Sequence, residues 1–251
     1  MSTKSHQRIP IDWMESSIGK DLISSERIII DEMLSDIFGY NAVQFGMPTV
    51  DFLSKCRLPN KIRLSGTAQG DVLASSENLP IKSNSTDLVV IPHGLEYVSN
   101  PHSVIREIHR ILVPGGSVVM SLFNPISLWG VRNIVSRARK SPLPWSGDYM
   151  SLWRVKDWLE LLSIEVETGC MTFYRPPFGK LSWREKFNFM EKAGDRWWPI
   201  FGGLYVLRGV KRVKGMRLTI DGWSSQKRLR PAIRATQKHA AKIIPIRREF
   251  G

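Results

Sequence analysis

Two side chains able to carry acid–base chemistry, His93 and Glu96, follow directly after the apolar run Asp87 to Pro92. A continuous apolar run of this length is typical of a strand buried on both faces of a parallel sheet. Ligands bind beyond the carboxyl ends of such strands, so both side chains are placed to face a substrate. We predict His93 as a general base near neutral pH and Glu96 as a group that orients an amine or hydroxyl. The alternative is that both only hydrogen-bond the backbone at the strand end.

A second candidate for ligand binding is the stretch "YNAVQFGMPTVDFL", Tyr40 to Leu53, in which alternating apolar residues lead to a single glycine, Gly46. A glycine after the first strand of a nucleotide-binding domain lets the backbone approach the ligand. The stretch alone does not distinguish such a loop from an ordinary turn.

Hydrophobic periodicity predicts the elements that position these residues. Helices are predicted over residues 11–38, 100–113 and 154–163. Strands are predicted over residues 40–46, 61–66, 70–76, 87–92, 117–123 and 164–174, with a last strand inside 199–212. Alternating strands and helices predict an α/β fold with a mostly parallel sheet and helices on both faces.

The segment Glu77 to Pro125 resembles the second half of the Rossmann-like domain of class I S-adenosylmethionine-dependent methyltransferases. The matching pieces are "LP" followed by a polar turn, "STDLVV" as the fourth strand, "LEYVSNP" leading into a helix, and "REIHRILVPGG" before the fifth strand. The resemblance extends over roughly residues 39–210. It implies a Rossmann-like α/β fold, S-adenosyl-L-methionine as cofactor, and a methyltransferase that acts on a small-molecule acceptor.

The resemblance also implies which residues bind the cofactor. They lie in the loop after the first strand, in the loop that contacts adenine in the family, and at the end of the fourth strand. They are Gln44, Gly46, Glu77, Asn78, Leu79 and Pro92. For Glu77 and Asn78 an ordinary surface loop is the alternative. The N-terminal helix is placed to close over the site, with Trp13 available to cover an adenosine.

The sequence departs from the family in its first half. Only Gly46 matches the glycine-rich loop, and no carboxylate follows the second strand until Asp71. The stretch from Gly46 to Leu79 is also too short for the helix that normally separates strands two and three. Each charge-assisted hydrogen bond lost from the ribose removes roughly 1.5–3 kcal/mol, or about tenfold in affinity. A catalytically inactive, methyltransferase-like binding module is therefore the alternative function.

Positive charge is concentrated at the C-terminal end. From Val206 onward 13 basic residues face two acidic ones, so 13 − 2 = +11 of the total charge of +13 lies there. We predict three parts: an N-terminal helical cap (1–38), a methyltransferase-like domain (39–212) with an aromatic-rich insertion at about 175–199, and a basic, disordered tail (213–251). The tail is either a solvated extension or a weak contact for nucleic acid or an anionic surface, a third functional alternative.

Other sequence features favour a cytoplasmic protein. The N-terminus has no apolar signal-peptide region, and the longest apolar runs are far too short to span a membrane. Two distant cysteines, Cys56 and Cys170, indicate a reduced protein without structural zinc or any other predicted metal site.

After the fifth strand, the residues Asn124, Pro125 and Trp129 are predicted to form loop structure and a pocket wall. Aromatic residues near the insertion either line an acceptor pocket or simply pack together; they are Tyr174, Trp183, Phe187, Trp197 and Trp198.

Overall fold

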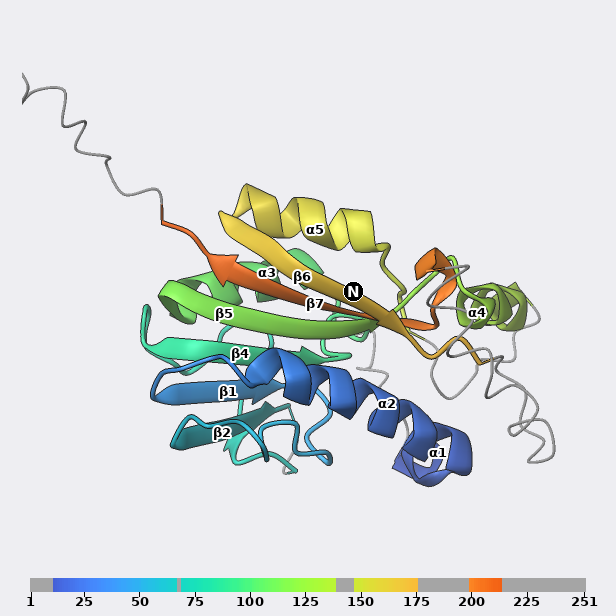
Figure 1. Ribbon diagram of the computed structural model, residues 1–251, viewed down its shortest axis with the longest axis horizontal. Coiled ribbons are helices and arrows are strands. Elements are labelled where there is room, and N and C mark those ends of the chain that lie inside the picture. The colour runs from blue at the N-terminus through green and yellow to red at the C-terminus, as the bar shows by residue number, and fades with distance from the viewer. Residues whose placement is uncertain (1–10, 67–68, 139–146, 176–198, 214–251) are drawn as a thin grey trace, which may run out of the picture. The chain divides into compact units, whose positions relative to one another are not determined.

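The computed structural model describes residues 11–66, 69–138, 147–175 and 199–213 (Figure 1). The chain divides into two compact units, Met1–Val213 and Lys214–Gly251. All described residues belong to the first unit. The predicted basic tail and most of the predicted aromatic insertion lie outside the described residues, so their roles and the predicted domain boundaries stay predictions.

The described part of the chain forms a seven-stranded sheet in the order β3-β2-β1-β4-β5-β7-β6. Strands β1 to β5 pair in parallel, whereas β7 is antiparallel to both β5 and β6. The strands are β1 (Asn41–Phe45), β2 (Asn60–Ser65), β3 (Val72–Leu73), β4 (Thr86–Pro92), β5 (Leu112–Phe123), β6 (Ile164–Thr172) and β7 (Leu204–Lys211). The predicted mostly parallel α/β sheet is confirmed.

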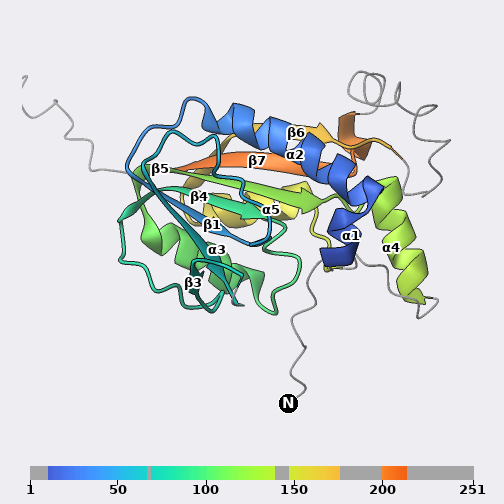
Figure 2. The same ribbon diagram turned by 90° about the horizontal axis from the view of Figure 1, so that it is seen from below.

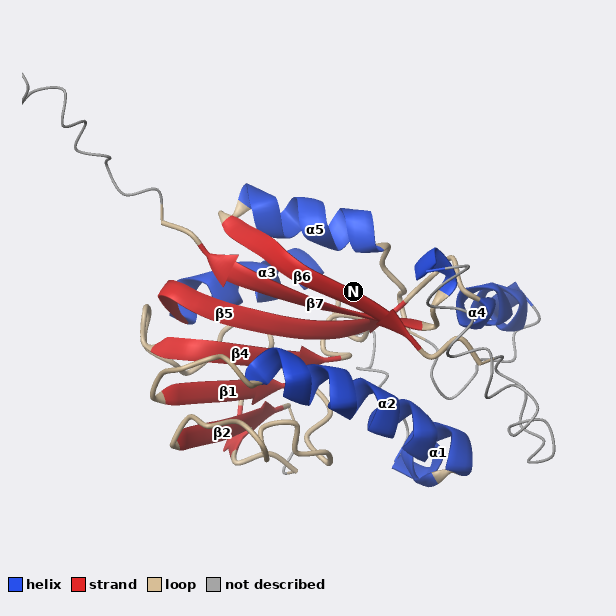
Figure 3. Cartoon of the chain, in the orientation of Figure 1, coloured by secondary structure: helices blue, strands red, loops and turns tan. Residues whose placement is uncertain are grey.

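Helices cover both faces of this sheet, as predicted (Figures 2 and 3). The helices are α1 (Ile11–Glu15), α2 (Ser17–Leu34), α3 (Pro101–Ile111), α4 (Leu128–Ala138) and α5 (Leu152–Leu161), with a short 3-10 helix η1 (Pro199–Phe201). Helix α2 lies on one face, and α3 and α5 lie on the other (Figure 2). No described helix has the length and apolar character needed to cross a membrane.

The central strand β4 is apolar from Leu88 to Pro92 because both of its faces are buried. Successive side chains of a strand point to opposite faces. Leu88 and Val90 pack in the layer under α2, and Val89 and Ile91 pack in the layer under α3, all fully buried. The strand that carries His93 at its end is therefore fixed from both sides.

Local sequence sets the ends of the helices. The predicted single helix over residues 11–38 is two helices, because Ser16 has an extended backbone and its hydroxyl accepts a hydrogen bond from the N–H of Gly19 at 3.2 Å. Asn100 caps α3 in the same way, accepting from the N–H of Ser103, with Pro101 in the first turn. These caps fix where α2 and α3 begin relative to the sheet.

Two elements differ from the prediction. Strand β5 begins at Leu112 rather than residue 117, because Leu112 already pairs with Thr86. The "PGG" residues therefore lie inside the strand, where the pairing register with β4 shifts. Helix α4 follows β5 where only loop structure was predicted. Most of its apolar residues lie on the solvent side, whereas Gly130, Asn133 and Ser136 lie on the buried side.

Candidate functional site

His93 is the first residue after β4, at the carboxyl end of the parallel strands. Its N–H donates a hydrogen bond to the carbonyl oxygen of Ser121 in β5 at 3.0 Å. Its backbone φ is 50°, in the left-handed region that residues other than glycine rarely occupy. The chain thus turns sharply at His93, and the imidazole enters the protein interior.

Two carboxylates face this imidazole. Nδ1 of His93 lies 2.8 Å from Oε2 of Glu96, and Nε2 lies 3.6 Å from Oε2 of Glu26 in α2. The other oxygen of Glu96 accepts from the N–H of Phe123, and the other oxygen of Glu26 accepts from the hydroxyl of Ser121. All three side chains are fully buried. We call Glu26, His93 and Glu96 the His93 cluster.

The His93 cluster holds a proton. Burial alone lowers the pKa of His93, but the charges of Glu96 and Glu26 outweigh it and raise this pKa from 6.5 to about 10. His93 is therefore an imidazolium near neutral pH in this conformation. A general base must be unprotonated, so the geometry favours a charge-holding role for His93, and its predicted role as a base stays a prediction.

Aromatic rings pack against the His93 cluster. The ring of Phe123 lies 4.6 Å from that of His93 and is stacked between Tyr149, at 5.1 Å, and Trp129, at 6.0 Å. Trp13 of α1 meets Trp129 edge-on at 6.5 Å. The carboxyl end of β5 thus combines buried charge with an apolar, aromatic surrounding.

The residues after β5 are mainly structural. The side-chain amide of Asn124 donates to the carbonyl oxygens of Ile200 at 2.7 Å and Gly202 at 3.0 Å. Trp129 is buried on α4 and donates from Nε1 to the carbonyl of Arg175 at 2.8 Å. Of the predicted aromatic residues near the insertion, Tyr174 is buried, whereas Trp183, Phe187, Trp197 and Trp198 lie outside the described residues.

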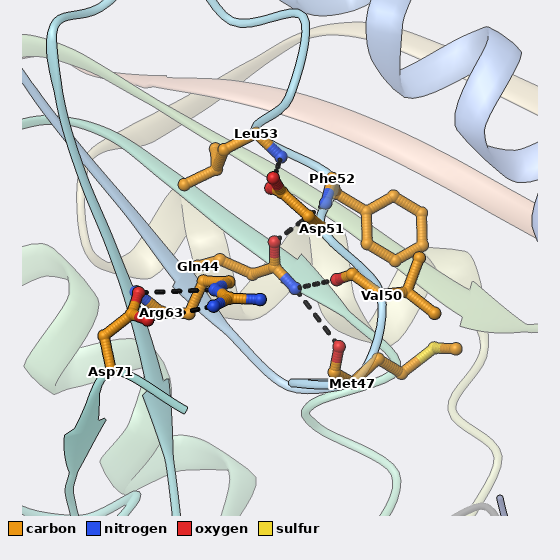
Figure 4. A network of polar contacts seen from close by, with 8 residues as sticks. All are labelled: Gln44, Met47, Val50, Asp51, Phe52, Leu53, Arg63 and Asp71. Atoms are coloured by element: carbon orange, nitrogen blue, oxygen red, sulfur yellow. Dashed lines mark hydrogen bonds and ion pairs between the residues drawn. The ribbon is translucent and has the colours of Figure 1, made fainter. Parts of the chain in front are cut away.

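Gln44 organises the loop after β1 (Figure 4). Its amide nitrogen donates to the carbonyl oxygens of Val50 at 2.7 Å and Met47 at 3.2 Å, and its oxygen accepts from the N–H of Phe52 at 3.0 Å. The side chain is fully buried. Gln44 therefore points into the loop that it holds, and the cofactor contact predicted for it stays a prediction.

Gly46 and Pro92, predicted from different motifs, lie together. Gly46 has a φ of 103°, and a Cβ at this position would lie 2.5 Å from the carbonyl oxygen of Pro92 and 3.0 Å from the Cα of Gly94. Glycine is thus required where the ends of β1 and β4 meet. This close contact is a structural reason for the glycine, independent of any ligand.

Asp71, the first carboxylate after β2, is paired with Arg63 (Figure 4). Its Oδ1 lies 2.9 Å from the guanidinium Nη2 of Arg63, and its Oδ2 accepts from the backbone N–H of the same residue at 2.9 Å. Strand β2 itself ends in Ser65. Among the described residues that follow β2, the ribose-binding carboxylate of the family therefore has no direct counterpart.

The predicted adenine loop is tied to α3. Glu77 and Asn78 are exposed, whereas Leu79 is buried. The N–H of Leu79 donates to Glu107 at 3.1 Å, and its carbonyl accepts from Arg110 at 3.0 Å. The Arg110 guanidinium in turn keeps the pKa of Glu107 below its usual value. The loop is fixed in place, with Glu77 and Asn78 presented to solvent.

Glu26 was not among the predicted site residues. It lies in the same helical row as Leu22 and Ile30, both fully buried, and it is itself fully buried. A carboxylate on the apolar face of an amphipathic helix was the signal that could have found it, because such a group needs a partner when buried.

Comparisons with known proteins agree with a methyltransferase-like domain. Residues 55–120 match the family model of a methyltransferase domain. An uncharacterised protein of Escherichia coli, YafS, is 28% identical over 236 residues, covering 91% of this chain and 92% of the relative. The ubiquinone/menaquinone biosynthesis C-methyltransferase UbiE of Coxiella burnetii is 37% identical over 57 residues, which is 23% of either chain.

Solved structures agree in fold. A methyltransferase of Thermotoga maritima that depends on S-adenosylmethionine superposes with a TM-score of 0.56 at 17% identity, covering 75% of this chain and 90% of that one. The predicted family resemblance is confirmed. The methyltransferase-domain match over residues 55–120 and the likeness in fold both agree with a resemblance to class I S-adenosylmethionine-dependent methyltransferases.

Proposed function

We propose that the protein transfers a methyl group from S-adenosylmethionine to a small-molecule acceptor that binds beside the His93 cluster. The observation that carries the proposal is the buried arrangement of Glu26, His93 and Glu96 at the carboxyl ends of β4 and β5. Ligands of open parallel sheets bind at this edge. A buried group of charges there is a functional-site signal, since each charge needs compensation to be buried.

The chain offers a modified set of residues for the cofactor. Gly46 leaves the backbone at the end of β1 without a side chain, and exposed Glu77 and Asn78 provide polar groups for the adenosine. Ser65 ends β2 where the family carries a carboxylate close by. When bound, the cofactor supplies a methyl group activated by a sulfonium. We expect weak affinity, about tenfold lower for each lost charge-assisted bond to the ribose.

In this proposal the carboxylate of Glu26 in the His93 cluster orients the acceptor and takes its proton. The imidazolium of His93 holds the carboxylates of Glu96 and Glu26 in place. Oε2 of Glu26 has no hydrogen-bond partner among the described residues, and we assign it to the O–H or N–H of the acceptor. Helix α2 carries Glu26 and must shift for an acceptor to reach this fully buried atom. Positioning then supplies most of the rate enhancement.

The aromatic surrounding favours a flat acceptor. The ring of Phe123 contacts His93 and stacks with the rings of Trp129 and Tyr149. Aromatic rings bind flat molecules through stacking and apolar burial. The Coxiella burnetii relative, by its name a C-methyltransferase of quinone biosynthesis, matches only a local segment but supports an aromatic acceptor. We therefore propose an aromatic ring that carries an ionisable hydroxyl or amine.

The test is transfer of a labelled methyl group to the small-molecule fraction of a cell extract. We expect a labelled product with the wild-type protein and a rate at least tenfold lower with Glu26→Gln. The matched control is Glu160→Gln, an exposed substitution on α5, which should leave the rate unchanged. If cofactor binds but no component is labelled, the protein is a binding module rather than a transferase.

A further inference from the structure

Helix α4 has its apolar side turned to solvent. Leu128, Val131, Ile134 and Val135 are between 42% and 64% exposed. At 100° per residue these positions fall within one third of the helix circumference. The face that packs on the protein contains Gly130, Asn133 and Ser136 together with Trp129. This is the reverse of the pattern expected for a helix on the surface of a globular domain.

The protein holds the buried, polar side of α4 in place by specific contacts. The side-chain amide of Asn133 donates to the carbonyl oxygen of Gly147 at 3.3 Å, and the guanidinium of Arg137 donates to the same carbonyl at 2.7 Å. A Cβ at Gly130 would lie 2.0 Å from the carbonyl oxygen of Pro125. The helix is therefore fixed in this orientation, and its apolar side faces outward as a defined surface.

Neighbouring residues extend this surface. Ile126, just before α4, is 43% exposed, and Ile200 and Phe201 of η1 are 46% and 53% exposed. Asn124 connects the two segments through its hydrogen bonds to the carbonyls of Ile200 and Gly202. We call Ile126, Leu128, Val131, Ile134 and Val135, with Ile200 and Phe201, the α4 surface. A group of exposed large apolar side chains of this kind indicates an interaction site.

Charge identifies the partner. The helical positions of Arg132 and Arg137 lie on either side of the apolar arc, and the sequence continues with Arg139 and Lys140. Arg137 pairs with Asp148 at 3.0 Å, which leaves the segment with an excess of positive charge. No aspartate or glutamate occurs between Glu107 and Asp148. Basic residues that border an apolar face are the pattern of a helix lying in the interface of an anionic membrane. A second copy of the chain would instead bring like charges together.

We propose that the α4 surface docks on an anionic lipid bilayer, with α4 parallel to the membrane plane. The apolar side chains enter the acyl boundary, and the net positive charge of the segment around α4 attracts the anionic headgroups. In Figure 1, α4 lies at the end of the sheet toward which the parallel strands run. The carboxyl edge of the sheet would then face the membrane, where an apolar small molecule is concentrated.

The test is flotation of the full-length protein with vesicles of phosphatidylcholine, with or without phosphatidylglycerol. We expect binding to the anionic vesicles that weakens at high salt, and a bound fraction roughly tenfold lower for the double variant Val131→Ser, Ile134→Ser. The matched control is Ile28→Ser with Leu161→Ser, which removes two exposed apolar residues elsewhere and should bind as the wild type does. Both variants keep residues 214–251, so any contribution of the basic tail is equal.

A further variant, Ile134→Glu, places a carboxylate at the most exposed of the large apolar residues of α4 and should abolish binding without affecting the fold. Circular dichroism confirms folding of each variant. The proposal is wrong if the wild-type protein does not float, or if the α4 variants float as well as the wild type. It is also wrong if light scattering shows a dimer that these substitutions dissociate, because the surface would then be a contact between copies.

Discussion

The imidazole Nε2 of His93, at the end of β4, lies 3.6 Å from the carboxylate Oε2 of Glu26, in the middle of α2. This relationship joins the N-terminal helix to the carboxyl edge of the sheet. It also makes the protonation state of the site depend on the position of α2. The predictions below follow from this arrangement and from the loop after β1.

Stability should depend on the proton of His93. The pKa is raised to about 10 in the folded protein from 6.5 in the unfolded chain. Because the folded protein binds the proton of His93 more tightly than the unfolded chain does, this proton stabilises the fold fully below pH 6.5. The stabilisation is lost as the pH rises through about 10. Urea unfolding between these limits should show a fall in the unfolding free energy on the order of a few kcal/mol. His93→Gln should remove most of the slope; an unchanged slope would contradict the assignment.

Replacing Glu26 with glutamine should destabilise the fold. The substitution removes one of two carboxylates that compensate a buried imidazolium, for which a loss of about 3–5 kcal/mol is typical. It should also lower the pKa of His93, which NMR titration of the ring protons measures directly. Ser121→Ala is the control, since it removes the hydroxyl that Glu26 accepts from but keeps both carboxylates. A His93 pKa that is equal in all three proteins would disprove the coupling.

A carboxylate, which the family often has near the end of this strand, should destabilise the fold when it replaces the amide of Gln44. Gln44→Glu would turn a donor to the carbonyls of Met47 and Val50 into an acceptor, leaving buried groups unpaired at about 1–3 kcal/mol each. Gln44→Met loses the same bonds without adding charge and should be less harmful. Thermal unfolding should therefore rank wild type above Gln44→Met, and Gln44→Met above Gln44→Glu. The reverse order of the two variants would show that the loop is not held in this way.

Two glycines with positive φ offer a matched comparison. Gly46→Ala meets the carbonyl oxygen of Pro92 at 2.5 Å, whereas Gly115→Ala, with φ of 82°, meets nothing within 4 Å. We expect Gly115→Ala to cost about 1 kcal/mol for its backbone alone and Gly46→Ala to cost at least twice as much. Equal losses in chemical denaturation would mean that the ends of β1 and β4 are not packed so closely.

Much of the fold could be predicted from the sequence because its signals are local. The apolar runs of β4 and β5 and the periodicity of α3 depend on residues close in the chain. The absence of a helix between β2 and β3 could be inferred from the short stretch between Gly46 and Leu79. His93 and Glu96 were found because they follow β4 directly, and the structure brings them within hydrogen-bond distance.

The remaining features depend on contacts between distant segments. Glu26 meets His93 only once α2 has packed on the sheet, so no spacing in the sequence indicates the pair. The break between α1 and α2 could be predicted only by recognising Ser16 as a helix cap within a stretch of continuous helical periodicity. Helix α4 was not predicted, although its sequence does separate into an apolar and a polar side. That the apolar side faces solvent depends on how α4 packs on the domain, which the sequence does not show. The small-molecule acceptor, the cofactor-contact residues and a cytoplasmic location stay predictions.

The most direct test of the central claim is a calorimetric titration of the full-length protein with S-adenosylmethionine. Our account predicts saturable heat, with affinity weakened by the missing ribose carboxylate. The Asp71→Asn variant should bind the cofactor as tightly as the wild type does, because the carboxylate of Asp71 is paired with Arg63 and is not expected to contact the cofactor. The absence of any binding heat at roughly millimolar cofactor, for a protein shown to be folded, would contradict an S-adenosylmethionine-dependent function.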